Sequence, residues 1–538
     1  MTPSYDANAY RFPSRRKVTY ATRGMVCCSQ PLAAQAGLDI LKAGGNAIDA
    51  AVAAAACMTV VEPTSNGIGS DAFALIFTGG RLYGLNGSGP APLAATAAKV
   101  RAQGHDTMPD RGWSPVNLHG APSAWAKAVG RFGRLPLKAV LEPAADIAQR
   151  GHAVTPTVAG MWKGAYDAFS RKFAADPAFR AWFDTFAAQG RAPGCGEIWR
   201  SPSHAATLRE LGETGCESFY RGSLAQKIAK ASCEQGGFLR EADLAGYEAQ
   251  WQEPIHVTYR GYDVWEMPPN GHGIVALMAL GILEGMEPGA YGEEGTVHRQ
   301  LEAMKLAFAD GKRYVADPAY MKVTAEQMLS GAYLSARRSL IGSDALTPSC
   351  GDPACGGTVY LCAADGEGNM VSWIQSNYMG FGSGIVVPGT GIALNDRGAN
   401  FSLNEGEENC LGPGKKSYHT IIPGFLTHKG RAVGPFGVMG GFMQPQGHVQ
   451  VIMNTLDYHM NPQEALDAPR WQWVGEKKIQ VEAGFDRETV EALRRRGHEV
   501  TVMEDCETFG RGQIIWRDEN GVLAAGSEPR CDGMAAAW

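Results

Sequence analysis

The residues best suited to do chemistry are Gly356, Gly357 and Thr358, which join a Gly-, Ser- and Pro-rich segment to a strand-like run. A threonine hydroxyl is a weak nucleophile unless a base stands beside it. One such base is its own α-amino group, which exists only after the preceding peptide bond is cut, and whose pKa of about 8 suits work near neutral pH. Gly357 is permissive enough to turn its carbonyl toward the hydroxyl for an N-to-O acyl shift. The pattern indicates a self-cleaving hydrolase, although Gly-Gly-Thr alone more often just begins a strand.

A second hydroxyl is expected beside Thr358. The turn Asp365–Asn369 between two strand-like runs is centred on residue 367, from which residues 358 and 376 are equidistant. Equidistant residues of an antiparallel hairpin face each other, so Ser376 should lie next to Thr358 and orient the new amino group. A cross-strand pair of Ser and Thr with no catalytic role is the alternative.

Two glycines are candidates for an oxyanion hole. Gly440 and Gly441 stand between a strand-like run (432–439) and a helix predicted to begin near Pro445. Consecutive backbone N–H groups at such a junction can point at an oxyanion. A Gly-Gly turn chosen only for its backbone shape is the alternative.

Other catalytic and metal-binding signatures are missing. The chain has no G-x-S-x-G, HExxH or Walker A motif, and no helix follows the glycines at 380, 382 and 384, as a dinucleotide site would require. Its 12 cysteines have no CxxC spacing and no histidines clustered near them, which predicts reduced thiols. Cys362 should share the strand face of Thr358, but as a buried apolar residue. We expect no metal and no organic cofactor.

Two helices near the start of the chain must support this site. The first is predicted over 31–43 and ends at Gly44-Gly45, and Asn46 caps a nearly all-apolar second helix that runs to Val61. A further helix over 296–314 places Leu301, Met304 and Phe308 on one face. The part before residue 340 is therefore expected to be mostly helical.

The composition and the hydrophobic pattern of the sequence change after residue 340. The segment 342–357 has no helical or alternating pattern, which is typical of a surface connection and suits an autolytic cut. Beyond it, strands are predicted over 359–364, 370–375 and 384–388, separated by Gly-rich turns.

Size and charge limit the function classes. The 538 residues carry a net charge of -6, with 49 basic and 55 acidic residues interspersed, so no basic stripe for nucleic acid is present. The polar segment 1–24 has no apolar core of a signal peptide, and the apolar run 47–61 is shorter than the about 20 residues of a membrane span. We expect a cytoplasmic protein with neither nucleic-acid nor membrane partners.

Over nearly its whole length the sequence resembles the gamma-glutamyltransferase family of N-terminal-nucleophile hydrolases. The likeness is carried by 34–69 (AQAGLDILKAGGNAIDAAVAAAACMTVVEPTSNGIG), 301–318 (LEAMKLAFADGKRYVADP), 358–401 and the Pro-Gly-Lys-Lys run 413–416. The resemblance implies an α/β, four-layer αββα sandwich, made as one proenzyme and cut into a large chain (1–357) and a small chain (358–538) that stay associated. It also implies Thr358 as nucleophile, Ser376 as its support, Gly440 with Gly441 as oxyanion hole, and no cofactor. A homodimer of the cut pair is one assembly it allows.

Departures from the family pattern concern the substrate pocket. Ser88 stands where the family has the Arg that holds the glutamyl carboxylate, and Asn400 stands where it has the Asp that holds the glutamyl ammonium. His419 and Thr420 replace the family's paired serines, and Tyr378 replaces an Asn. The resemblance therefore places these residues around a substrate that lacks the glutamyl head group.

Arg397 lies in the same segment as Asn400 and offers a planar fork for a carboxylate. The pattern is similar to the branch with oxamate amidohydrolase and with glutathione-hydrolase-like and cephalosporin-acylase-like proteins. A small anionic amide such as oxamate fits one Arg and no ammonium site. A structural salt bridge at Arg397 is the alternative.

Three other functions stay open. A glutathione hydrolase or gamma-glutamyltransferase with a remodelled pocket is the nearest, and a cephalosporin-acylase-like amidase is the next. A non-enzymatic binding module that keeps the fold is the third, although Thr358, Ser376 and the glycine pair together disfavour it. A serine or cysteine hydrolase lacks any activating context in the sequence.

Overall fold

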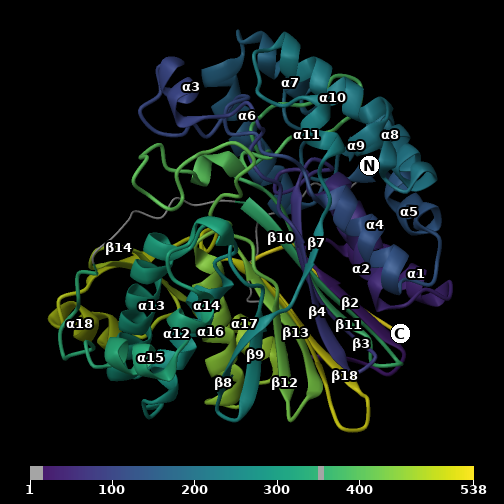
Figure 1. Ribbon diagram of the computed structural model, residues 1–538. Helices are drawn as coiled ribbons and strands as arrows, with labels where there is room; N and C mark the ends of the chain where they lie inside the picture. Colours follow the sequence, from purple (N-terminus) through teal and green to yellow (C-terminus); the bar gives the residue numbers. More distant parts are fainter. Residues whose placement is uncertain (1–15, 349–356) are drawn as a thin grey trace, which may run out of the picture.

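The protein is a four-layer αββα sandwich, as the sequence led us to expect. The computed structural model describes residues 16–348 and 357–538. Two seven-stranded sheets pack face to face, and helices cover the outer face of each (Figure 1). This arrangement buries both faces of both sheets, which is why many of their strands are apolar on either side.

The first sheet contains the strand that begins next to the proposed cut. All its neighbouring strands are antiparallel, in the order β19 (Met534–Ala537), β2 (Gly24–Cys28), β10 (Gly357–Asp365), β11 (Met370–Tyr378), β3 (Asp71–Thr78), β4 (Arg81–Gly87) and β7 (Gln250–Gln252). The predicted hairpin is β10 and β11, at the middle of the sheet. Strands from both sides of the proposed cut are therefore interleaved.

The second sheet packs its inner face against the first and is also antiparallel throughout. Its order is β1 (Thr19–Ala21), β18 (Leu523–Ser527), β17 (Arg511–Arg517), β13 (Arg431–Met439), β12 (Gly424–His428), β9 (Tyr262–Glu266) and β8 (Ile255–Tyr259). The Tyr360 ring of the first sheet lies against Gly437 of the second, where a Cβ atom would be only 2.4 Å from the ring. Only glycine at 437 allows this close approach.

The outer helices of the first sheet confirm two predictions. Helix α1 (Pro31–Lys42) packs on β2, and α2 (Ala47–Val61) packs on β10 and β11 and is buried on every side. The Asn46 side chain accepts hydrogen bonds from the backbone N–H groups of Ile48 and Asp49, as expected of a cap. The other helices of this half are α3 (Ala97–Ala102), α4 (Ala121–Phe132), α5 (Leu137–Arg150), α6 (Pro156–Phe173), α7 (Arg180–Phe186), α8 (Pro202–Thr214), α9 (Glu217–Arg221), α10 (Ser223–Glu234) and α11 (Glu241–Ala245).

The second sheet is covered by α12 (Gly273–Glu284) and α16 (Met443–Leu456), together with the short helix α17 (Pro462–Asp467). Helix α16 begins two residues before the predicted start. The predicted 296–314 helix is α13 (Glu294–Tyr314), with Leu301, Met304 and Phe308 buried. The remaining elements are α14 (Ala325–Met328), α15 (Gly331–Arg338), α18 (Arg487–Arg495), a small sheet of β14 (Trp471–Gly475), β15 (Lys478–Glu482) and β16 (Glu499–Met503), and the pair β5 (His152–Ala153) and β6 (Ile198–Trp199).

One predicted strand is wrong. Residues 384–388 form turns and a single bridge between Val386 and Ala393. The cause is the glycine content, because Gly384 and Gly389 have φ values of +75° and +72° that interrupt an extended run. Within the predicted connection, 342–348 form neither helix nor strand, and 349–356 lie outside the described residues. In the described part of the chain, we find no helix both long and apolar enough to cross a membrane.

Candidate active site

Thr358 and Ser376 lie side by side at the end of the β10–β11 hairpin that is farthest from its turn. Val359 pairs with Gln375, and a bulge at Gly357 shifts the register by one residue before it reaches Tyr378. The two hydroxyl oxygens, Thr358 Oγ1 and Ser376 Oγ, are 3.1 Å apart and both residues are buried. The backbone N–H of Tyr378 donates to Ser376 Oγ at 2.8 Å, which fixes that hydroxyl. The hairpin thus places a supporting oxygen against the candidate nucleophile.

The Gly440-Gly441 turn lies close to Thr358, because the Nε2 of Gln444, three residues after Gly441, is 3.5 Å from Thr358 Oγ1. Gly440 and Gly441 have φ values of +130° and +59°, which favour glycine at both positions. Their carbonyls accept hydrogen bonds from the first turn of α16, at 3.0 and 3.2 Å. Such a turn can present backbone N–H groups to an oxyanion.

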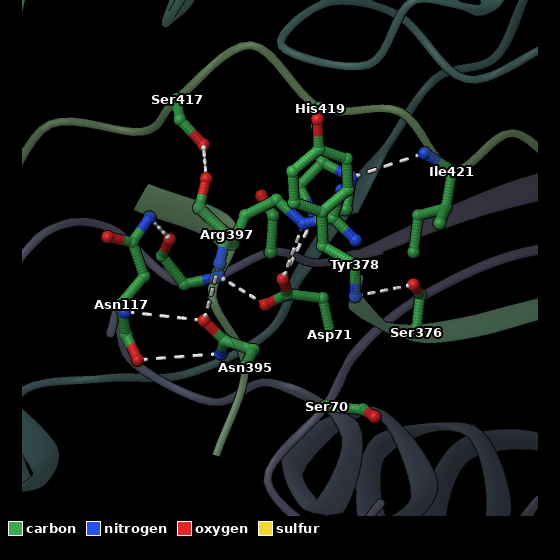
Figure 2. Close-up of polar contacts among 12 residues, drawn as sticks. Ser70, Asp71, Asn117, Ser376, Tyr378, Asn395, Arg397, Ser417, His419 and Ile421 are labelled. Carbon is green, nitrogen blue, oxygen red and sulfur yellow. Dashed lines mark hydrogen bonds and ion pairs between the residues drawn. The ribbon is translucent and has the colours of Figure 1, made fainter. Parts of the chain in front are cut away.

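Arg397 is the centre of a buried polar network (Figure 2). It begins a short 3-10 turn, η3 (Arg397–Asn400), and is 0% exposed. Its Nε donates to Asp71 Oδ2 at 3.2 Å, and its Nη1 donates to Thr420 Oγ1 at 2.7 Å. Its Nη2 is buried and has no hydrogen-bond partner among the described residues. Arg397 therefore forms the structural salt bridge that was the alternative to a substrate-binding role. Its Nη2 group still has no hydrogen-bond partner in the part of the chain that the structure describes.

Asp71 is a buried residue of this network that our sequence analysis missed. It begins β3, pairs with Ser376 across the sheet, and accepts a hydrogen bond from Gly89 N–H at 3.1 Å. Burial would raise the pKa of Asp71, but the hydrogen bond from His419 and the charge of Arg397 hold it below its usual value. A charged residue that opens an otherwise apolar strand is the signal that pointed to a buried partner.

His419 and Thr420 lie on opposite sides of the same ion pair. His419 Nε2 is 3.1 Å from Asp71 Oδ2, and the Ile421 N–H donates to Nδ1 at 3.4 Å, so Nε2 carries the proton. Burial, with the charge of Arg397 adding to it, lowers the pKa of His419 to about 4. The ring is therefore neutral at physiological pH and orients Asp71.

The other three predicted pocket residues have different surroundings. The Tyr378 ring lies 4.7 Å from the Arg397 guanidinium, and its φ of +87° is strained for a tyrosine. The Asn400 Nδ2 is buried without a hydrogen-bond partner among the described residues. Ser88 Oγ donates to Asn86 at 2.6 Å, and the next residue, Gly89, contacts Asp71. Tyr378 thus contacts Arg397, Asn400 ends the short turn that Arg397 begins, and Ser88 is joined to Asp71 only through Gly89.

One group of side chains has the composition of a metal site. His298, Glu302 and His498 are buried, and one ligand atom of each lies within 4.8 Å of the others. However, Lys305 Nζ donates to Glu302 at 2.7 Å and lies 3.4 Å from His498 Nδ1, while His498 Nε2 lies 2.9 Å from His298 Nδ1. His298 Nε2 in turn faces the carbonyl of Gly342 at 3.0 Å. The ammonium group of Lys305 therefore already pairs with Glu302 in this cluster. Through His298 and the Gly342 carbonyl, the cluster also links α13 to the segment 342–348.

Comparisons with known proteins agree with one another. Residues 33–538 match the family model described as Gamma-glutamyltranspeptidase. The crystal structure of cephalosporin acylase from Bacillus halodurans is 58% identical, with a TM-score of 0.97 over 99% of both chains. The glutathione hydrolase-like proenzyme of Bacillus subtilis is 35% identical, and the oxamate amidohydrolase proenzyme of Klebsiella pneumoniae subsp. pneumoniae is 34% identical. Each covers 96% of this chain and 99% of its own length.

Proposed function

The chain belongs to the gamma-glutamyltranspeptidase family, and we propose that it is an autoprocessing amidohydrolase for amides whose acyl part carries a carboxylate and no ammonium group. Thr358 is the nucleophile and oxamate is the smallest such substrate. The observation that carries the proposal is the pairing of Thr358 and Ser376, 3.1 Å apart, with Ser376 paired across the sheet to Asp71, which binds a buried arginine whose Nη2 has no hydrogen-bond partner among the described residues.

The first step is cleavage of the bond between Gly357 and Thr358. Thr358 Oγ1 attacks the Gly357 carbonyl carbon, its proton passes to the departing backbone nitrogen, and an ester replaces the peptide bond. Water then hydrolyses the ester, which leaves a carboxylate on Gly357 and an α-amino group on Thr358. Ser376 Oγ supports this step because it is held by the Tyr378 N–H and faces the attacking oxygen.

The two products, 1–357 and 358–538, are expected to stay associated. In the first sheet β10 lies between β2 and β11, and in the second β12 lies between β9 and β13. Each sheet therefore contains strands from both products, and separation would break backbone hydrogen bonds across the core.

Turnover uses the new amino group as base. It takes the proton of Thr358 Oγ1 as that oxygen attacks the substrate carbonyl carbon, and the carbonyl oxygen becomes negative beside the Gly440-Gly441 turn. The amino group returns the proton to the leaving nitrogen, which departs as ammonia or an amine. Water resolves the acyl ester by the same proton transfers in reverse, releasing the carboxylic acid.

Two buried N–H donor groups without hydrogen-bond partners among the described residues favour a carboxylate on the acyl part of the substrate. Arg397 and Asn400 are three residues apart in a 3-10 turn, where side chains at that spacing lie on one side. Arg397 Nη2 and Asn400 Nδ2 are both buried without partners among the described residues. A buried donor left unsatisfied costs about 1–3 kcal/mol, so a substrate oxygen at this place would relieve the cost. An amide in place of a carboxylate at 400 also removes the group that would hold an ammonium.

A second candidate is an acylase that acts on larger carboxylated amides. The 58% identity to cephalosporin acylase over 99% of both chains favours it. Both candidates share the carboxylated acyl group and the acyl-Thr358 ester, and they differ in the size of the leaving amine.

The proposal predicts a specific substrate ranking. Cleaved protein should release ammonia or amine from oxamate or from a glutaryl amide, and be at least about tenfold slower on a gamma-glutamyl anilide, because a buried ammonium without a partner is unfavourable. The matched control is an acyl amide with the same chain length as the glutaryl amide but without its carboxylate, and it should also be hydrolysed slowly. Initial rates on the four substrates decide the matter. A preference for the gamma-glutamyl compound would restore the glutathione hydrolase alternative.

A further inference from the structure

Gln444 contacts the nucleophile from a segment that none of the catalytic motifs includes. It lies in the first turn of α16, three residues after Gly441, and is 0% exposed. Its Oε1 accepts a hydrogen bond from the Ile422 N–H at 2.9 Å, and its Nε2 donates to Thr358 Oγ1 at 3.5 Å. The carboxamide therefore bridges the Ile422 segment and the attacking oxygen.

The orientation of this carboxamide is fixed by its partners. A backbone N–H can only donate, so the oxygen of Gln444 must face Ile422 and the nitrogen must face Thr358. The backbone N–H of Gln444 also donates to the Gly441 carbonyl at 3.2 Å. The side-chain donor and the glycine turn thus form one rigid unit beside Thr358.

We propose that Gln444 is a further catalytic residue, whose Nε2–H hydrogen-bonds Thr358 Oγ1 before attack and the adjacent oxyanion during it. In the tetrahedral intermediate both oxygens are bonded to the same carbon. The Gln444 Nε2 group, which is 3.5 Å from Thr358 Oγ1, can therefore also reach the oxyanion. Hydrogen bonds at catalytic sites are often long before substrate binds and shorten in the transition state. The inference rests on the proposed function, because it assumes that Thr358 is the nucleophile.

The competing explanation is that Gln444 only holds the Ile422 segment in place. The same helix offers a matched control in Gln446, which is 1% exposed. Its Nε2 donates to the Phe442 and Trp473 carbonyls at 3.1 and 3.2 Å, and its Oε1 accepts from the Trp473 N–H at 2.6 Å. Gln446 is thus a buried glutamine that is hydrogen-bonded to backbone, and within the described residues these hydrogen bonds do not include Thr358.

The test compares Gln444→Met, Gln444→Glu and Gln446→Met in the full-length protein. The glutamate variant keeps an oxygen for the Ile422 N–H but has no donor for Thr358, so it isolates the donor even where the methionine variant folds poorly. We expect both Gln444 variants to lose about 10²–10³-fold in kcat with little change in KM, and to cut themselves more slowly. Gln446→Met should lower the melting temperature while leaving kcat near that of the unmodified protein.

The outcomes separate this inference from the function on which it rests. If the unmodified protein cuts and turns over substrate while Gln444→Met and Gln444→Glu match its kcat, Gln444 is structural and only the inference falls. Equal losses of kcat in the Gln444 and Gln446 variants, in step with their melting temperatures, would likewise make it structural. If the unmodified protein never cuts, the proposed function falls and takes the inference with it.

Discussion

Replacing Thr358 with alanine is expected to leave one intact chain of 57.4 kDa, less one CH2O unit, that neither cuts itself nor hydrolyses any amide. The Oγ1 atom is the attacking group in both reactions, so no other residue can substitute for it, and turnover should fall by at least about 10⁴-fold. The substitution removes one buried hydroxyl and one buried methyl group, so folding should be retained. Intact mass and a rate assay on a carboxylated amide measure the two effects.

Thr358→Ser is the matched control for this variant. It keeps a hydroxyl at the same position, 3.1 Å from Ser376 Oγ in the present structure, and should still cut and still turn over. A Thr358→Ala protein that is cut and active would move the nucleophile to another residue and end the account given above.

Replacing Arg397 with methionine is expected to affect stability and substrate binding together. Arg397 and Asp71 are both 0% exposed, so removing the arginine leaves a buried carboxylate without its cation. The free energy of unfolding should fall by about 3–5 kcal/mol. The Nη2 donor proposed to bind the substrate carboxylate is lost as well. KM for a carboxylated amide should therefore rise by about tenfold to a hundredfold. Chemical denaturation and steady-state kinetics separate the two effects.

A double variant, Arg397→Met with Asp71→Asn, distinguishes binding from folding. It leaves no buried charge unpaired, so much of the lost stability should return. KM should stay high, because the donor for the carboxylate is still missing. Recovery of KM together with stability would mean that Arg397 serves only the fold, and the carboxylate site would have to be sought elsewhere.

The sequence was most informative where a local rule decides the structure. The turn centred on residue 367 sets the register of β10 and β11, which is enough to bring Ser376 to Thr358. Asn46 marks the start of α2 because a side-chain cap needs only neighbouring residues. The prediction of a strand over 384–388 failed for the converse reason, because Gly384 within it and Gly389 just after it adopt positive φ and override a weak strand pattern.

The sequence was least informative about contacts between layers. Asp71 lies 326 residues from Arg397, and Gln444 lies 86 residues from Thr358, so no spacing rule connects them. Only the tertiary contacts between the start of β3 and η3, and between the first turn of α16 and the start of β10, make them partners. The same limit explains why the segment of Arg397 suggested a pocket residue, while its ion pair with Asp71 could not be predicted.

The most direct test of the central claim is intact mass with N-terminal sequencing of the purified protein after several hours at neutral pH. The account predicts two fragments that remain together under native conditions, the smaller beginning at Thr358 and ending at Trp538. Such a fragment identifies the nucleophile without knowledge of any substrate. A single chain of 538 residues that persists under these conditions would contradict the account, and so would a cut at any bond other than the one between Gly357 and Thr358.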